Sequence, residues 1–182
     1  MSIKYAILGL LSWKPLTGYE IKKLMEDSII LYWSGNNNQI YKSLVQLHEE
    51  NLVTTEVQHQ QNAPSRKIYT ITASGLSALK QWTLSAPEAP EYKKAFFVQL
   101  AWSHQQSNEE TDQLLSEYEQ ELSIRLAYQQ EKHARRNGYP DRDQREKLLW
   151  STMAQNVIAS IENELRWVDS VRRELAAVGR EK

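Results

Sequence analysis

The chain has 182 residues, a formal net charge of −1 and no cysteine. The lack of cysteine excludes disulfide bonds and thiolate-ligated metal sites, and no apolar run approaches the roughly 20 residues that a membrane-spanning helix needs. The apolar segment 5–11 has no small-residue cleavage site behind it, so we expect no secretion signal and a cytoplasmic protein.

Two helices are predicted near the start of the chain. The first buries an apolar stripe made of Ile3, Ile7, Leu10 and Leu11. Lys14-Pro15 ends it, because proline disfavours helical geometry in the residue before it. Thr17 and Glu20 then have the spacing of a capping box, in which each side chain accepts from the other residue's backbone amide, and this box starts the second helix.

Residues 34–72 predict a third helix that runs into a two-stranded hairpin. Polar residues that can cap a helix open the segment, and Ile40, Leu44 and Leu47 form its inward stripe. Asn51 can take the left-handed conformation that ends a helix. Two β-prone runs, 52–58 and 66–72, follow it. A helix of this kind fits the DNA major groove, and a basic hairpin, or wing, beside it reaches the phosphates.

The outward side of the third helix carries groups that suit base edges: Asn37, Asn38, Gln39, Tyr41, Lys42 and Gln46. In the hairpin, Arg66, Lys67 and Tyr69 suit phosphate contacts, which position a protein without specifying a sequence. Plainer interpretations stay open. The asparagines would then only cap the helix and remain hydrated, and the hairpin charges would be ordinary surface.

The charge is distributed unevenly along the chain. Residues 1–85 hold eight Lys or Arg and six Asp or Glu, a balance of +2, which leaves 14 and 17 in residues 86–182, a balance of −3. The distribution matters more for a nucleic-acid partner than the sum does. A small positive balance predicts modest non-specific DNA binding and a dependence on dimerisation for useful affinity.

Helical periodicity continues after the stiff segment 86–90, in helices near 92–104, 108–136 and 141–178, with Asn108 and Asp141 as predicted caps. The last helix carries an apolar seam of Leu149, Met153, Val157, Ile161, Leu165 and Val168, which favours coiled-coil-like packing. We interpret this seam as the interface of a homodimer, because closed twofold dimers dominate homo-oligomers. The alternative is a helical bundle within one chain.

A few aromatic residues are the only indication of a small-molecule site. Phe96, Phe97, Trp102 and Trp150 are candidates to line a pocket for a flat ligand, although buried aromatics at helical spacing are more often plain core. The effector-binding residues are therefore not assigned from sequence. The four histidines are isolated, and no nucleophile elbow, phosphate loop or dinucleotide fingerprint is present. We predict no enzyme, no metal and no cofactor.

The motifs and their order resemble a known family. Residues 5–11 followed by 15–21 are similar to the opening of PadR-family transcriptional regulators, and 39–47 and 64–75 resemble that family's recognition helix and wing. The remainder resembles, more loosely, the helical C-terminal domain of the family's larger subgroup, which is related to virulence activators. The resemblance implies a winged-helix dimer, usually a repressor, sometimes released from its operator by small aromatic or phenolic compounds. Lys42 stands where many members carry proline, and Asn51 where glycine is usual.

We therefore expect a mainly α fold. Residues 1–85 would form a winged helix-turn-helix domain with a two-stranded wing, 86–90 a linker, and 91–182 a helical dimerisation domain that also holds any effector site. The predicted function is sequence-specific regulation of transcription by a homodimer on a pseudo-palindromic, double-stranded DNA operator. The alternative is a winged-helix adaptor that binds another protein and assembles through its helical tail. An adaptor should display large apolar anchors on the outward face of residues 36–46, and in this chain that face is polar and hydrogen-bonding.

Overall fold

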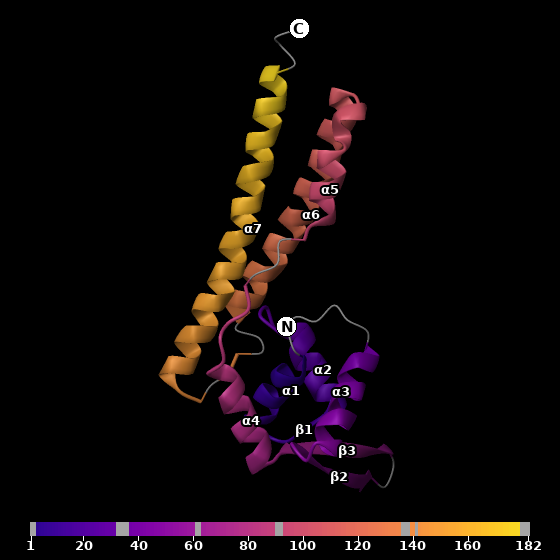
Figure 1. Cartoon of the computed structure of the whole chain (residues 1–182), viewed down its shortest axis with the longest axis vertical. Coiled ribbons are helices and arrows are strands. Elements are labelled where there is room, and N and C mark those ends of the chain that lie inside the picture. The colour runs from indigo at the N-terminus through magenta and orange to yellow at the C-terminus, as the bar shows by residue number, and fades with distance from the viewer. Residues whose placement is uncertain are drawn as a thin grey trace. The chain divides into compact units, whose positions relative to one another are not determined.

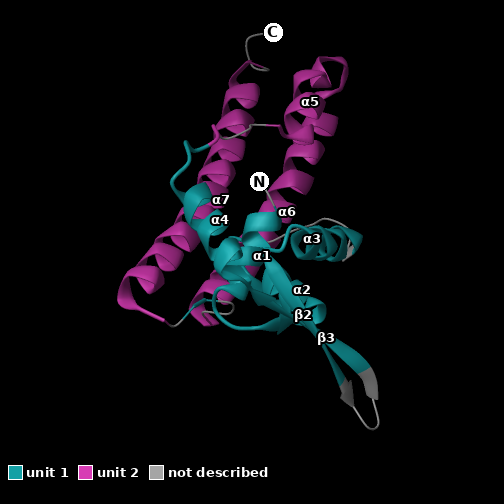
Figure 2. Cartoon of the chain, turned by 60° about the horizontal axis from the view of Figure 1, so that its bottom comes forward, with its two compact units in different colours: residues 1–87, 138–140 teal, residues 88–137, 141–182 magenta. Residues whose placement is uncertain are grey.

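The computed structural model describes residues 3–31, 37–60, 63–89, 93–135, 139–140 and 142–178. The chain forms two compact units, residues 1–87 with 138–140 and residues 88–137 with 141–182 (Figure 2). Helices make up about half of the first unit and most of the second, and the described residues form one small antiparallel sheet (Figure 1). The predicted fold class is confirmed.

The first unit contains the predicted helices and hairpin. Its elements are α1 (Ile3–Leu11), β1 (Leu16–Thr17), α2 (Gly18–Asp27), α3 (Asn37–Glu49), β2 (Val53–Gln60), β3 (Ala63–Ile71) and α4 (Ala73–Thr83). The strand order is β1-β3-β2, with antiparallel neighbours. Strand β1 was not predicted, because two residues are too few to show an alternating pattern. It exists through its pairing with Ile68 and Tyr69 of β3.

One hydrophobic core holds the helices of this unit on the sheet. Ile40, Leu44 and Leu47 of α3 all lie in it, as their helical spacing predicts, together with residues of α1, α2 and the strands. Burying such side chains stabilises the fold by about 1.5–3 kcal/mol each. Because one stripe of α3 is anchored in this way, the opposite side of the helix lies in solvent.

Local hydrogen bonds set the start of α2 and the end of α3. The Thr17 hydroxyl accepts from the Glu20 amide at 3.2 Å, and the Glu20 carboxylate accepts from the Thr17 amide at 2.7 Å, so the predicted capping box is present. Asn51 has φ of 58°, and the amide of Leu52 donates to the Leu47 carbonyl at 2.9 Å. This is a Schellman ending, which turns the chain from α3 directly into the wing.

The hairpin is longer than predicted. Strands β2 and β3 replace the expected 52–58 and 66–72, and the ladder reaches from Val53–Ile71 to Gln60–Ala63, with an irregularity between Gln58 and Gln60. The polar residues near the tip were expected to form a loop because they lack apolar alternation. They pair nonetheless, since a solvated antiparallel ladder needs backbone hydrogen bonds and no burial.

The second unit consists of α5 (Ala95–Ala101), a short 3-10 helix η1 (Ser103–Gln105), α6 (Asn108–Arg135) and α7 (Gln144–Val178). The two long helices lie side by side and run in opposite directions (Figure 1). Asn108 is not the cap of α6, because the Ser107 hydroxyl accepts from the Glu110 amide instead. Asp141 lies outside the described residues, and Asp143 accepts from the Glu146 amide near the start of α7.

The apolar seam of α7 is divided between two environments. Ile161 and Val168 are buried in the core of this unit against Leu115 and Leu122 of α6, with Val157 and Leu165 packed beside them. Leu149 and Met153, nearer the start of α7, are 50% and 40% exposed. The prediction of a single seam for a partner was wrong for its C-terminal part, because α6 presents a matching stripe within the same chain.

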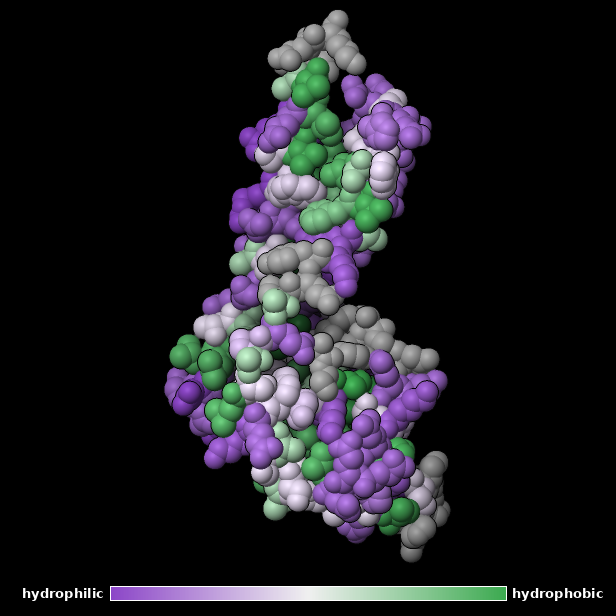
Figure 3. All heavy atoms as spheres, in the orientation of Figure 1, coloured by the Kyte–Doolittle hydropathy of each residue, from purple (hydrophilic) through white to green (hydrophobic). Residues whose placement is uncertain are grey.

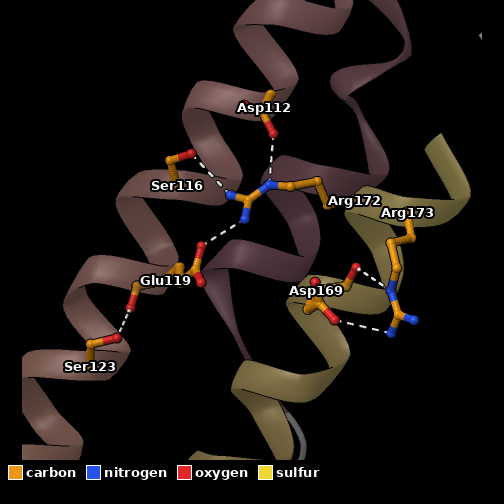
Figure 4. Close-up of polar contacts among 7 residues, drawn as sticks. All are labelled: Asp112, Ser116, Glu119, Ser123, Asp169, Arg172 and Arg173. Atoms are coloured by element: carbon orange, nitrogen blue, oxygen red, sulfur yellow. Dashed lines mark hydrogen bonds and ion pairs between the residues drawn. The ribbon is translucent and has the colours of Figure 1, made fainter. Parts of the chain in front are cut away.

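Polar contacts also join α6 to α7 (Figure 4). The Arg172 guanidinium donates to Asp112 and Glu119, each at 2.7 Å, and to the Ser116 hydroxyl at 2.9 Å. The bonds to the two carboxylates, chiefly that to Glu119, raise the pKa of Arg172 above its ordinary value. One side chain of α7 is thereby fixed to two successive turns of α6. No helix in the described ranges is both long and apolar enough to span a bilayer.

Candidate nucleic-acid interface

The solvent side of α3 carries most of the predicted base-reading residues. The side chains of Asn38, Gln39, Tyr41, Lys42 and Gln46 are all exposed. Most of them border a shallow groove along the helix, together with Val45 and Glu49. Asn37 is the first residue of α3, but its side chain lies outside the described part of the structure. This face is a hydrogen-bonding surface with one aliphatic side chain, Val45, at its centre.

A second groove connects α3 to the wing. It has a volume of about 470 Å³ and is lined by Thr17, Gly18, Tyr19, Glu20, Tyr41, Ser65, Arg66, Lys67 and Tyr69. The fold therefore brings Tyr41, predicted on the helix, together with all three residues predicted on the wing. The sequence did not predict that the start of α2 lines this groove. The pattern of residues 17–20 is fully accounted for by a capping box, so it gave no sign of a second role.

The wing residues differ in accessibility. Arg66 and Lys67 are exposed, and neither makes an ion pair among the described residues. Tyr69 is only 6% exposed, so it forms a wall of the groove and belongs to the core rather than projecting freely. Burial, followed by the nearby Tyr41, raises the pKa of Tyr69. The Lys67 ammonium lies 5.6 Å from the Tyr69 ring, so this buried ring supports an exposed cation.

Gly18 positions the Tyr41 ring. A Cβ atom at Gly18 would lie 2.6 Å from Cε1 of Tyr41, closer than atoms can approach. The ring thus packs directly on the backbone at the start of α2 while Tyr41 stays 46% exposed. The two residues are 23 positions apart, and no local pattern in the sequence could reveal this contact.

The charged side chains of the second groove differ in how far they are engaged by neighbouring groups. The Glu20 carboxylate is engaged by Thr17, whose backbone amide is the largest cause of its lowered pKa, with Lys14 and Arg66 as smaller causes. Its charge is partly compensated at the helix start, where an acid is favourable. The two wing cations are the charged groups of this groove that remain available to an anion such as a DNA phosphate.

Gln46 has partners that the sequence did not reveal. Its Nε2 donates to Oε1 of Glu50 at 2.8 Å, and the other oxygen of Glu50 forms an ion pair with Lys4 of α1. The bonds from Lys4, and then from Gln46, lower the pKa of Glu50.

The aromatic effector candidates do not form one site. Phe96 is buried, stacked on Tyr118 and edge-on to Trp167, while Phe97 is edge-on to the same tryptophan. Trp102 is 70% exposed. Trp150 lies 17 residues before Trp167, roughly 26 Å along α7 at the helical rise per residue. Phe96 and Phe97 thus belong to a packed aromatic cluster.

A cavity of about 330 Å³ lies elsewhere in the second unit. It is lined by Ser103, His104, Gln106, Asn108, Thr111, Asp112, Leu115, Arg172, Leu175 and Ala176, and by none of the predicted aromatic candidates. This volume is at the lower end of the range for small-molecule pockets. In the described parts of the chain, no group of three or more acidic or histidine side chains is placed to hold a metal ion.

Two family models match the chain in separate regions. Residues 7–81 match the transcriptional regulator PadR-like family, and residues 92–176 match the model for the C-terminal region of virulence activator alpha. The first match lies within the winged unit, and the second lies within the helical unit except for residues 138–140.

A curated relative agrees with the first match. The chain is 35% identical over 100 residues to the negative transcriptional regulator PadR of Bacillus subtilis (strain 168), which is 55% of each protein. It spans about half the length of the curated relatives it matches.

Solved structures cover nearly the whole chain. Bacillus subtilis PadR in complex with operator DNA has a TM-score of 0.82 at 24% identity, covering 95% of this chain and 98% of that one. The same protein in complex with p-coumaric acid has a TM-score of 0.78 at 24% identity, covering 96% and 98%. The Vibrio cholerae virulence activator AphA has a TM-score of 0.72 at 28% identity, covering 97% and 99%.

Proposed function

Because the chain belongs to the PadR-like family of transcriptional regulators, we propose that it binds a pseudo-palindromic DNA operator as a homodimer and represses transcription. One observation carries the proposal: the exposed face of α3 is rich in hydrogen-bonding groups and shares, through Tyr41, a groove with the wing cations Arg66 and Lys67. The helix that would contact the bases and the wing that would contact the phosphates are then adjacent.

The residue types fit the chemistry of the major groove. Amides such as those of Asn38 and Gln39 bond an adenine edge, lysine prefers guanine or a phosphate, and Val45 suits the methyl group of thymine. Residues near the start of a recognition helix enter the groove deepest, which favours Asn38, Tyr41 and Lys42 as base-reading residues. Arg66 and Lys67 would neutralise phosphates and fix the register on the duplex.

Exposed apolar residues of the helical unit support the homodimer. Leu148, Leu149 and Met153 are exposed on the first turns of α7, and Leu175 and Val178 near its end. Figure 3 shows apolar surface along the upper part of this unit, where α7 ends. A second copy would cover such surface and place two recognition helices about 34–36 Å apart, or a multiple of that distance.

Repression and release by an effector are proposed from the relatives. The 35% identical relative is named a negative regulator, and a structure of the same Bacillus protein contains p-coumaric acid. We propose that a small aromatic or phenolic compound likewise releases this chain from DNA. The cavity in the second unit has room for a small ligand, and none of the four predicted aromatic residues lines it.

The adaptor hypothesis has less support. Val45 and Tyr41 are the exposed apolar or aromatic residues on the outer face of α3, and Tyr41 also carries a hydroxyl. Protein-binding hot spots are instead clusters of large side chains that fill pockets of the partner.

Selection from a random double-stranded DNA pool tests the proposed function. The full-length protein should enrich an inverted repeat, and addition of p-coumarate should release the bound DNA if phenolic compounds are effectors. A variant combining Arg66→Ala and Lys67→Ala should fold but recover little DNA. Recovery of an unenriched pool by the unchanged protein would contradict the proposal.

A further inference from the structure

At the C-terminal end of α3, a side chain on the outer face of the helix is held by its neighbours. Gln46 lies on the outer face of that helix, one turn before Glu50. Within the described residues, the only hydrogen bond of its side chain runs from Nε2 to Oε1 of Glu50. A carboxylate only accepts hydrogen bonds, so the nitrogen end of the Gln46 amide must be the end that faces Glu50. The carbonyl oxygen of the amide is the end left to face a base.

Glu50 is itself held in place by another element. Lys4 of α1 forms an ion pair with the carboxylate oxygen that Gln46 does not use, and α1 packs against α3 in the core. Glu50 also directly precedes the left-handed Asn51, so its backbone is fixed by the Schellman ending. The carboxylate is thus oriented from two directions.

Helix stability does not explain an acid at this place. A negative charge at the C-terminal end of a helix opposes the helix dipole, and a lysine nearby only offsets that cost. A hydrogen-bonded pair four residues apart adds a few tenths of a kcal/mol. Lys4, Glu50 and Gln46 form a chain of contacts whose outer end is a side chain on the candidate DNA-reading face.

We propose that Lys4 and Glu50 orient the Gln46 amide so that its carbonyl oxygen selects a base with an exposed N–H group, adenine or cytosine. This inference rests on the proposed DNA-binding function. In the major groove, adenine offers its N6 amino group and cytosine its N4 amino group, whereas the edges of guanine and thymine offer only acceptors. A glutamine free to rotate could present its nitrogen to those acceptors. The contact with Glu50 disfavours that rotation, because it would bring two oxygen atoms together.

The test is the base preference of the full-length protein at each operator position. Wild type, Gln46→Ala and Glu50→Gln are compared by sequencing DNA selected from one random pool. Glu56→Gln is the matched control, because it removes the same charge from an exposed residue of β2 that has no hydrogen bond to α3 among the described residues. Melting temperatures establish that each variant is folded.

We expect one base pair in each half-site at which wild type prefers one orientation of the exposed amino group of adenine or cytosine and Gln46→Ala shows no preference. At that position Glu50→Gln should reduce the preference about tenfold, the size of one good base contact. A neutral amide at position 50 can accept or donate, so Gln46 is free to turn. Glu56→Gln should leave this preference intact. Lys4→Ala should also weaken this base preference, because it removes the cation that holds the Glu50 carboxylate. Lys4→Arg keeps a cation at position 4 and should retain the preference.

Two outcomes for the carboxylate variants would overturn the inference: an unchanged preference in Glu50→Gln, or the same change in Glu56→Gln. An unchanged profile in Gln46→Ala would also overturn it, while an enriched wild-type operator would leave the regulator proposal standing. If wild type enriches nothing, the proposed function itself fails.

Discussion

At the scale of single residues, the proposed function assigns different roles on DNA to Lys42 and Lys67. Lys42 lies on the outer face of α3, and Lys67 lies on the wing above the Tyr69 ring. Lys42→Ala should cost about 1–3 kcal/mol of operator binding and alter the base preference. Lys67→Ala should weaken all duplexes about equally and reduce the slope of log affinity against log salt by about one. Salt titrations on an operator and a shuffled duplex measure both effects, and equal behaviour of the two variants would contradict this division.

Gly18 tests whether Tyr41 must lie where the structure places it. Gly18→Ala drives a methyl group against the Tyr41 ring and should weaken operator binding severalfold as the ring is displaced. Gly9→Ala is the control, because a Cβ atom there meets nothing within 4 Å. That change should stabilise α1 by about 0.5–1 kcal/mol and leave DNA binding intact. Fluorescence anisotropy with an operator duplex decides the matter, and equal affinities of the two variants would refute the role of Gly18.

At the scale of elements, the capping box makes the start of α2 sensitive to pH. The pKa of Glu20 is lowered in the folded protein, mainly by the Thr17 amide, so its stabilising contribution is full above the ordinary carboxyl pKa. The contribution is lost as the pH falls through the lowered folded-state value. Melting temperatures from pH 7 down to pH 3 should therefore fall less steeply for Glu20→Gln than for wild type. Parallel curves would show that the carboxylate contributes nothing.

The elements that the sequence predicted well are those with local causes. The 3.6-residue spacing of Ile40, Leu44 and Leu47 is enough to orient α3, and Thr17 with Glu20 is enough to start α2. Contacts between distant segments could not be predicted. Tyr69 looks like a surface residue of a polar hairpin until α1 and α2 pack on β3. Gly18 has no visible partner until α3 is in place.

The same limit applied to the helical unit. A stripe such as that of Ile161 and Val168 fits a second copy and a helix of the same chain equally well, and periodicity does not distinguish them. The structure packs Ile161 and Val168 against α6, whereas Leu175 and Val178 near the end of α7 stay exposed. The aromatic candidates also proved divided, because helical spacing gives the direction of Phe96 but not what lies opposite it.

At the scale of the whole molecule, the proposed homodimer predicts different effects of substitutions at Met153 and at Ile161, two positions of the apolar seam of α7. Met153→Lys places a charge on an exposed apolar residue and should convert dimers into folded monomers. Ile161→Lys buries an unpaired charge against α6 and should destabilise the helical unit itself. Sedimentation velocity with circular dichroism distinguishes these effects. A Met153→Lys protein that remains dimeric would exclude that part of α7 from the interface.

The central claim is that one surface, formed by α3 and the wing, reads a particular DNA sequence. The most direct test is the dissociation constant of the full-length protein for its selected operator and for a shuffled duplex, both at physiological salt. Specific recognition predicts that the operator binds at least about a thousandfold more tightly. Equal dissociation constants for the two duplexes would contradict the claim.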